Sequence, residues 1–322
     1  MSSARFIGAV AAGAAAAGAA RLAYSAVTRW PPGGQKAWSR TNHRGEPVTL
    51  LEGPAVAAGA IAGVLAQTVL AQTVLARVGL APVTGSSRRR AAAMAVGAVG
   101  AAAFGAYDDL AGSGDRRGFR GHLGALRHGE VTTGAVKLGG IGVTGLVSAA
   151  LAGGSPADLI VNAGLVAGGA NLLNLFDLRP GRAIKVAAVS GVLIGPAGPD
   201  RVAAPLGAAL ALLPEDLGER AMLGDAGANA LGAMLGAAAA GLSRPARIVV
   251  LAGIAGLTAA SEKVSFTKVI ARTPALNWLD MLGRRPVSAV SIPAQRRDAM
   301  NLTEAGTAAR SAEKTDPQPS DE

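Results

Sequence analysis

Two adjacent carboxylates, Asp108 and Asp109, stand directly after a long uncharged run of the chain. Adjacent carboxylates repel each other unless a cation lies between them or one of them takes a proton. The pair therefore suits the binding of a divalent cation. A solvated helix end is the alternative interpretation of the pair taken alone.

A second polar group, Asn171, Asn174 and Asp177, has its members three residues apart, so all three share one face of a helix. Amides paired within a helix bundle would explain the two Asn residues without any ligand. They explain less well why an Asp follows on the same face, so we also expect a binding role for this group.

Asp225 lies in the third group, between Gly224 and the Ala226-Gly227 pair. Helix capping is one interpretation, because Asp is a preferred capping residue at a helix N-terminus. Glycines on both sides would also let backbone N–H groups approach a phosphate or a metal-bound oxygen.

The fourth group is the segment 262–285, which mixes basic, acidic, hydroxyl and Trp side chains and includes Glu262 and Arg272. This composition is expected of a loop that binds a head group. An amphipathic surface helix is the alternative.

Long uncharged runs surround these four groups and indicate the elements that position them. Charged residues make up 16% of the chain, against about 25% in a typical soluble domain. The runs without Asp, Glu, Lys or Arg cover 6–20, 53–76, 91–107, 138–157, 159–176, 186–199, 202–214, 226–243 and 248–261. Because about 17 to 25 apolar residues span a bilayer, five runs are long enough by themselves. We predict an all-α, polytopic membrane bundle of about nine transmembrane helices, packed through small residues.

The basic residues predict the orientation of this bundle. Alternation between the two sides places more Lys and Arg on the face that holds Arg220 and the segments 21–44, 116–137, 179–185 and 263–285. The opposite face holds Arg5, Arg77, Arg88, Arg89, Arg90, Arg201, Arg244 and Arg247. The positive-inside rule puts the richer face, and with it all four polar groups, in the cytoplasm. The net charge of +10 is then a topology signal, and nucleic acid need not be invoked.

The composition also limits the kinds of site. The chain has no Cys and three His residues, which excludes a disulfide framework and a Cys- or His-rich metal site. Carboxylates and amides are hard oxygen ligands, and Mg²⁺ usually takes one or two carboxylates together with substrate phosphates. The residues therefore favour Mg²⁺ and a diphosphate at the cytoplasmic membrane surface.

The ordered motifs resemble those of the polyprenyl-phosphate sugar-1-phosphate transferases of the glycosyltransferase 4 type, over roughly residues 1–286. The family has a D-D pair, a Lys-Leu step that opens the next helix, an N-x-x-N-x-x-D segment and a (M/L)-G-D-x-G stretch. Here these are found in the same order as Asp108-Asp109, Lys137-Leu138, 171–177 and 223–227.

The resemblance implies transfer of a sugar-1-phosphate from a UDP-sugar to a polyprenyl phosphate, undecaprenyl or decaprenyl, with release of UMP, for a cell-envelope glycopolymer related to peptidoglycan. It implies Asp225 and Asp109 as Mg²⁺ ligands, Asp108 as the base or orienting group for the acceptor, and Lys137 as a phosphate contact. The residues expected to bind substrate are Asn171, Asn174, Asp177, Arg179, Arg182, Glu262 and Arg272.

Several positions depart from the family pattern. Pro180 stands where a second Asp is usual, the Lys that often follows the D-D pair is missing, and the last cytoplasmic loop has no histidine motif. Arg179 and Arg182 either compensate for missing charge or mark a site that has lost catalysis. The alternative function is thus a catalytically silent membrane scaffold or lipid-phosphate-binding protein of the same fold.

The predicted domains are a transferase-like membrane domain, 1–286, and a disordered cytoplasmic tail, 287–322. The expected location is the plasma membrane, as a multi-pass protein whose active site faces the cytoplasm. The expected partners are the polyprenyl phosphate acceptor, the UDP-sugar donor and membrane lipids. A homodimer is one oligomeric state that the sequence allows.

Overall fold

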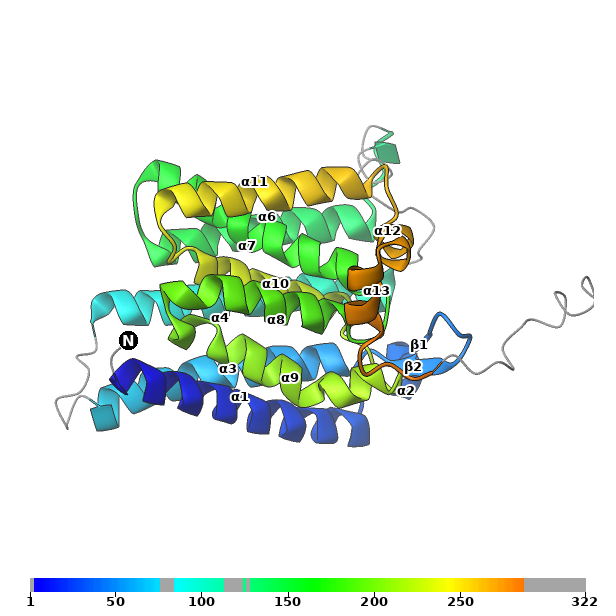
Figure 1. Ribbon diagram of the computed structural model, residues 1–322, viewed down its shortest axis with the longest axis horizontal. Coiled ribbons are helices and arrows are strands. Elements are labelled where there is room, and N and C mark those ends of the chain that lie inside the picture. Colours follow the sequence, from blue (N-terminus) through cyan, green and yellow to red (C-terminus); the bar gives the residue numbers. More distant parts are fainter. Residues whose placement is uncertain (1–2, 76–83, 113–123, 126–127, 287–322) are drawn as a thin grey trace, which may run out of the picture. The chain divides into compact units, whose positions relative to one another are not determined.

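In the part of the chain that the structure describes, the protein is a bundle of helices with a single small hairpin (Figure 1). The computed structural model describes residues 3–75, 84–112, 124–125 and 128–286, and the predicted all-α class is confirmed over these ranges. The chain divides into two compact units, Met1–Arg284 and Arg285–Glu322. The predicted disordered tail, 287–322, lies outside the described residues.

Among the described residues, five helices are long and apolar enough to cross a membrane. The uncharged runs of the sequence predict these helices, because a helix satisfies its own backbone hydrogen bonds and can expose uncharged, apolar side chains to lipid. These helices are α1 (Ser3–Arg29), α3 (Glu52–Leu70, continued by the π-helical turn η1, Ala71–Leu75), α4 (Gly85–Ala111), α6 (Thr133–Ala152) and α7 (Pro156–Phe176).

The remaining helices are shorter. They are α2 (Gln35–Trp38), α8 (Arg182–Ile194), α9 (Ala203–Leu217), α10 (Gly224–Ala239), α11 (Arg244–Ser261), α12 (Phe266–Arg272) and α13 (Pro274–Met281), with the 3₁₀ turns η2 (Gly195–Ala197) and η3 (Pro199–Arg201). Helices α11 and α12 are long and apolar enough to cross a membrane only when they are taken together, and a bend of 98° separates them. The described residues therefore contain five membrane-spanning candidates, or six with this pair, and the count of about nine stays a prediction.

Two helices differ from the lengths of their uncharged runs. Helix α1 continues past the run 6–20 to Arg29, and Arg21 within it forms an ion pair with Glu215 at 3.0 Å. Helix α10 has only 16 residues, although the run 226–243 is long enough to span a bilayer. Its side chains from Ala226 to Ala239 are buried, so α10 is the core of the bundle.

Small residues let α10 approach its neighbours closely. It packs mainly against α4 and α7. A Cβ atom on Gly232 would lie 2.2 Å from the carbonyl oxygen of Gly169, and one on Gly236 would lie 2.1 Å from that of Leu165. The backbones of α7 and α10 are therefore in direct contact, as expected for membrane helices that pack through small residues.

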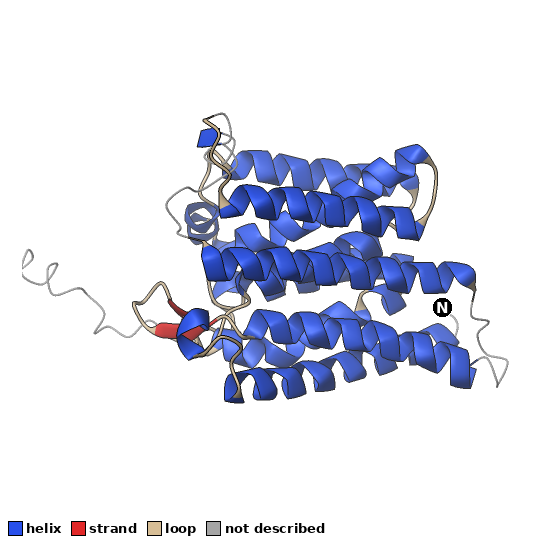
Figure 2. Cartoon of the chain, turned by 180° about the vertical axis from the view of Figure 1, so that it is seen from behind, coloured by secondary structure: helices blue, strands red, loops and turns tan. Residues whose placement is uncertain are grey.

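The two ends of the bundle differ in structure (Figures 1 and 2). At one end lies an antiparallel hairpin of β1 (Ser39–Thr41) and β2 (Pro47–Thr49), together with α2, α12 and α13. We call this the hairpin end; α4 and α7 finish there, and α6 and α10 begin there. At the opposite, distal end, α6 finishes and α7 and α11 begin.

Candidate functional site

Lys137 joins two of the predicted carboxylates at the hairpin end. Its ammonium lies 2.7 Å from the Asp108 carboxylate and also forms an ion pair with the Asp225 carboxylate. These three side chains are 14%, 17% and 22% exposed, in the order Lys137, Asp108 and Asp225. The cluster therefore lies at the margin of the bundle, within reach of solvent.

Three helix ends position this cluster. Asp108 lies in the last turn of α4, Lys137 in the first turns of α6, and Asp225 in the first turn of α10. Helices α4 and α10 meet at Gly105, where a Cβ atom would lie 2.3 Å from the carbonyl oxygen of Asp225. A side chain at this position would push the end of α4 away from the start of α10.

Asp109 has a different role from its neighbour. Its two carboxylate oxygens accept hydrogen bonds from the backbone N–H groups of Asp225, at 3.1 Å, and Ala226, at 2.9 Å. These N–H groups belong to the first turn of α10 and have no partner within the helix. Gly224, with φ +59°, turns the chain into this position. Asp109 thus caps α10 from another helix, while the Asp225 side chain is left for Lys137.

The Asn–Asp group lies at the end of α7. Asn171 contacts Thr258 of α11 at 3.4 Å, and Asp177 is the C-terminal cap of α7. Asp177 is buried and accepts a hydrogen bond from the backbone of Gly224, next to Asp225. Burial raises the pKa of Asp177 well above its usual value, and the charges of Asp216 and Asp225 raise it further. Asn174 is partly exposed in the same turn of the helix.

The two arginines that follow α7 differ in their contacts. Arg182 is buried and donates to both carboxylate oxygens of Asp280 in α13, at 2.7 and 3.1 Å, and to the Thr267 hydroxyl in α12 at 3.0 Å. Arg179 is partly exposed and donates to the carbonyl of the preceding residue. Arg182 therefore fastens α12 and α13 to the bundle, and Arg179 retains charge near the surface.

Glu262 and Arg272 lie on the segment that runs from the end of α11 through α12. Both residues are exposed to solvent. The structure thus places this segment at the hairpin end, through the Asp280 contacts, and leaves its two predicted binding side chains on the surface.

Three buried acids at this end, outside the segment 262–285, were missed by the sequence analysis; one of them, Glu219, pairs with Arg44 at 2.9 Å. Glu52, at the start of α3, has 0% exposure, and Asp216, near the end of α9, has 2%. Both oxygens of Glu52 and one each of Asp177 and Asp216 lack a hydrogen-bond partner among the described residues. The positions of Glu52 and Asp216 in the sequence could have indicated them, because Glu52 directly precedes one uncharged run and Asp216 follows another.

The donor set fits a magnesium ion only in part. The described residues contain no group of three or more His, Asp or Glu side chains arranged to hold a metal. Mg²⁺ nevertheless binds through one or two carboxylates when a substrate supplies phosphates, and Asp108 and Asp225 are such a pair. Asp109, predicted as a ligand, instead directs both oxygens to the α10 backbone.

Fold and site together define a helical protein with several helices able to cross a membrane and an acidic cluster around one lysine at the hairpin end. Neither a scan against protein-family models nor a search of curated proteins finds a match to the chain. The functional proposal therefore rests on the cluster of Lys137, Asp108 and Asp225.

Proposed function

We propose that the protein is a membrane phosphoglycosyl transferase of the glycosyltransferase 4 type. An oxygen of a polyprenyl phosphate attacks the sugar-bearing phosphorus of a UDP-sugar. A new P–O bond forms to the acceptor as the bridging P–O bond of the donor breaks, and UMP leaves with the bridging oxygen. The product is a polyprenyl diphosphate sugar for cell-envelope polymer synthesis.

One observation carries this proposal: residues from three separate motifs converge on one ammonium group. Asp108, Lys137 and Asp225 come from three helices, and Lys137 bonds to both carboxylates. A capping role explains Asp109 but not Asp225, whose side chain turns to Lys137. Carboxylates gathered at the ends of apolar helices are expensive to maintain and favour a functional site.

Each residue has a proposed task at this site. Asp108 and Asp225 would hold Mg²⁺, and the ion, when bound, would neutralise charge on the donor diphosphate. Lys137 would contact a substrate phosphate in place of its two carboxylate partners, because those carboxylates would then hold the metal. Asp109 keeps the start of α10 in place, and Asn174 and Asp177 bind the nucleoside side of the donor.

The test is UMP release by the purified chain with Mg²⁺, undecaprenyl phosphate and a panel of UDP-sugars. We expect turnover with at least one donor, and loss of it in Asp225→Asn with unchanged folding in detergent. Glu215→Gln is the matched control, because Glu215 lies at the same end and pairs only with the surface residues Arg21 and Arg220 in the described contacts. No UMP release with any donor would contradict the proposal.

The second candidate is a silent scaffold or lipid-phosphate-binding protein of the same fold. It is favoured by the contacts that already pair the charged groups of the site, since Lys137 offsets one of the two negative charges of Asp108 and Asp225, and Asp280 balances Arg182. This candidate predicts binding of a polyprenyl phosphate without UMP release. It also predicts that Asp225→Asn lowers the thermal stability of the protein.

A further inference from the structure

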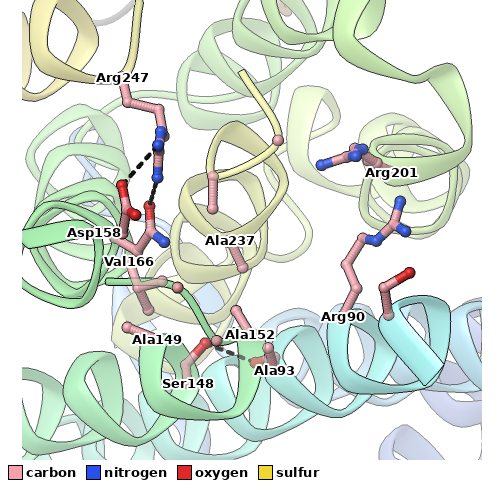
Figure 3. A pocket seen from close by; sticks show the side chains of 16 residues that line it. Arg90, Ala93, Ser148, Ala149, Ala152, Asp158, Val166, Arg201, Ala237 and Arg247 are labelled. Atoms are coloured by element: carbon pink, nitrogen blue, oxygen red, sulfur yellow. Dashed lines mark hydrogen bonds and ion pairs between the residues drawn. The ribbon is translucent and has the colours of Figure 1, made fainter. Parts of the chain in front are cut away.

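A pocket of about 300 Å³ lies at the distal end, where the proposed transferase site has no residues (Figure 3). It is bordered by the start of α4, the end of α6, the start of α7, the end of α10, the start of α11 and η3. Its charged lining residues are Arg90, Asp158, Arg201 and Arg247. Three guanidinium groups therefore face a space that holds one carboxylate.

Arg247 is fixed by its neighbours on one side of the pocket. It donates to Asp158 at 2.8 Å and to Asn162 at 2.9 Å (Figure 3). Asp158 is held in turn by Ser155, whose hydroxyl donates to it at 2.7 Å. Arg247 thus already balances the lining carboxylate, and the carboxylate near the other two arginines is Asp200, which is not part of the pocket lining.

Arg90 and Arg201 lie together on the other side of the pocket from Arg247 (Figure 3). The nearest carboxylate that pairs with Arg90 is Asp200, at a long 4.0 Å. The buried Nε of Arg201 has no hydrogen-bond partner in the described part of the chain. Burial lowers the pKa of Arg201, and the positive charge of Arg90 lowers it further. An anion placed between these two groups would satisfy both.

The backbone leaves space for Arg201 in particular. A Cβ atom on Gly241, just beyond the end of α10, would lie 1.4 Å from Nη1 of Arg201. Glycine at this position therefore admits the guanidinium beside the pocket. Since this contact involves the end of a flexible side chain, a methyl group here would displace the guanidinium rather than the backbone.

We propose that the distal pocket binds a phosphate group through Arg90 and Arg201, opposite the ion pair of Arg247 and Asp158. Guanidinium groups match the geometry of phosphate oxygens through paired N–H donors. Basic pockets between membrane helices are suited to lipid head groups. The ligand is either an anionic lipid head group or a soluble phosphate. Both present the same phosphate oxygens to the two guanidinium groups.

The experiment measures thermal stabilisation of the full chain in detergent by two probes. One is inorganic phosphate compared with chloride at equal ionic strength, and the other is dihexanoyl phosphatidylglycerol compared with dihexanoyl phosphatidylcholine. We expect Arg201→Gln to weaken binding of the active probe by about tenfold, the loss of one charged hydrogen-bonding group. Gly241→Ala should weaken it in the same direction, and Arg244→Gln, an exposed arginine at the same end, should leave it unchanged.

Each outcome decides the proposal. Stabilisation by phosphate indicates a soluble ligand, and stabilisation by phosphatidylglycerol alone indicates a lipid head group; both support a phosphate site when Arg201→Gln and Gly241→Ala weaken the effect. The proposal is overturned if neither probe stabilises the wild-type chain over its control. It is also overturned if Arg244→Gln weakens binding as much as Arg201→Gln, because the effect would then be general surface charge.

Discussion

Lys137 pairs with two carboxyl groups that also contact each other at the hairpin end. Removing the ammonium leaves Asp108 and Asp225 as an unbalanced, largely buried pair. Breaking a buried ion pair by removal of one partner is strongly destabilising, whereas replacing all of its members is much less so. The stability of the cluster and its chemistry can therefore be separated by mutation.

We predict that Lys137→Gln lowers the free energy of unfolding by about 2–4 kcal/mol, and that adding Asp108→Asn restores part of the loss. Chemical denaturation in detergent measures both variants. The proposed transferase activity should remain absent in the double variant, because the phosphate contact is still missing. Equal stability of the single and double variants would show that Lys137 does not bridge the carboxylates.

Asp216 gives the stability of the protein a pH dependence. Burial raises the pKa of Asp216 to about 7, above about 3.9 for an unperturbed Asp. Between these values the folded protein holds a proton that the unfolded chain has released, so the free energy of unfolding falls as pH rises, by at most about 1.4 kcal/mol per pH unit.

We therefore expect Asp216→Asn to flatten the fall in the free energy of unfolding between pH 5 and pH 7. Denaturation at several pH values in this window measures the slope. Glu215→Gln is the matched control, because hydrogen bonding from Arg220 lowers the pKa of the adjacent Glu215 and keeps its titration below the window. A wild-type slope retained in Asp216→Asn would contradict this account.

At the scale of elements, the close contact between α7 and α10 depends on missing side chains. We predict that Gly236→Ala destabilises the protein by about 1–3 kcal/mol, because its methyl group meets the backbone of Leu165. Gly253→Ala in α11, where nothing lies within 4 Å of the new atom, should be neutral or stabilising. Thermal unfolding of both variants tests this, and equal effects would exclude backbone contact as the cause.

The buried ion pair between Arg182 and Asp280 helps to hold α12 and α13 on the bundle, together with the hydrogen bonds from Arg182 to Thr267 and from Lys185 to the Asp280 carbonyl. Burial raises the pKa of Asp280, but hydrogen bonds from Arg182 and nearby positive charges outweigh this effect and lower it overall. We expect Asp280→Ala to increase hydrogen exchange in α12 and α13 and to leave α10 protected. Lys268→Gln, an exposed change in α12, is the control; equal exchange in both variants would exclude Asp280 as the fastening.

The uncharged runs predicted most helices because lipid excludes charge, and this rule acts locally along the sequence. It underestimated α1 because the run ends at the charged Arg21, whereas the helix continues through this exposed residue to Arg29. It also could not separate the buried α10 from a lipid-facing span. Asp108, Lys137 and Asp225 could be proposed as a group from their order. The division of roles between Asp108 and Asp109 could not, since it depends on how α4 meets α10 at Gly105.

At the scale of the whole bundle, the two ends carry opposite chemistry. The hairpin end gathers carboxylates around Lys137 and buries Glu52, Asp177 and Asp216. The distal pocket gathers arginines. A soluble UDP-sugar is available only in the cytoplasm, so the proposed transferase requires the hairpin end to face that compartment, and the distal pocket then faces the opposite surface.

The absence of Cys from the sequence makes this orientation directly measurable. A single cysteine can be placed at the exposed Lys263, after α11 at the hairpin end, or at the exposed Arg244, at the distal start of α11. In intact cells we expect a membrane-impermeant maleimide to label Arg244→Cys and to reach Lys263→Cys only after permeabilisation. The reverse pattern would place Lys137 and its carboxylates outside the cell, where no UDP-sugar reaches them, and would exclude the transferase while leaving the distal phosphate site open to a cytoplasmic ligand.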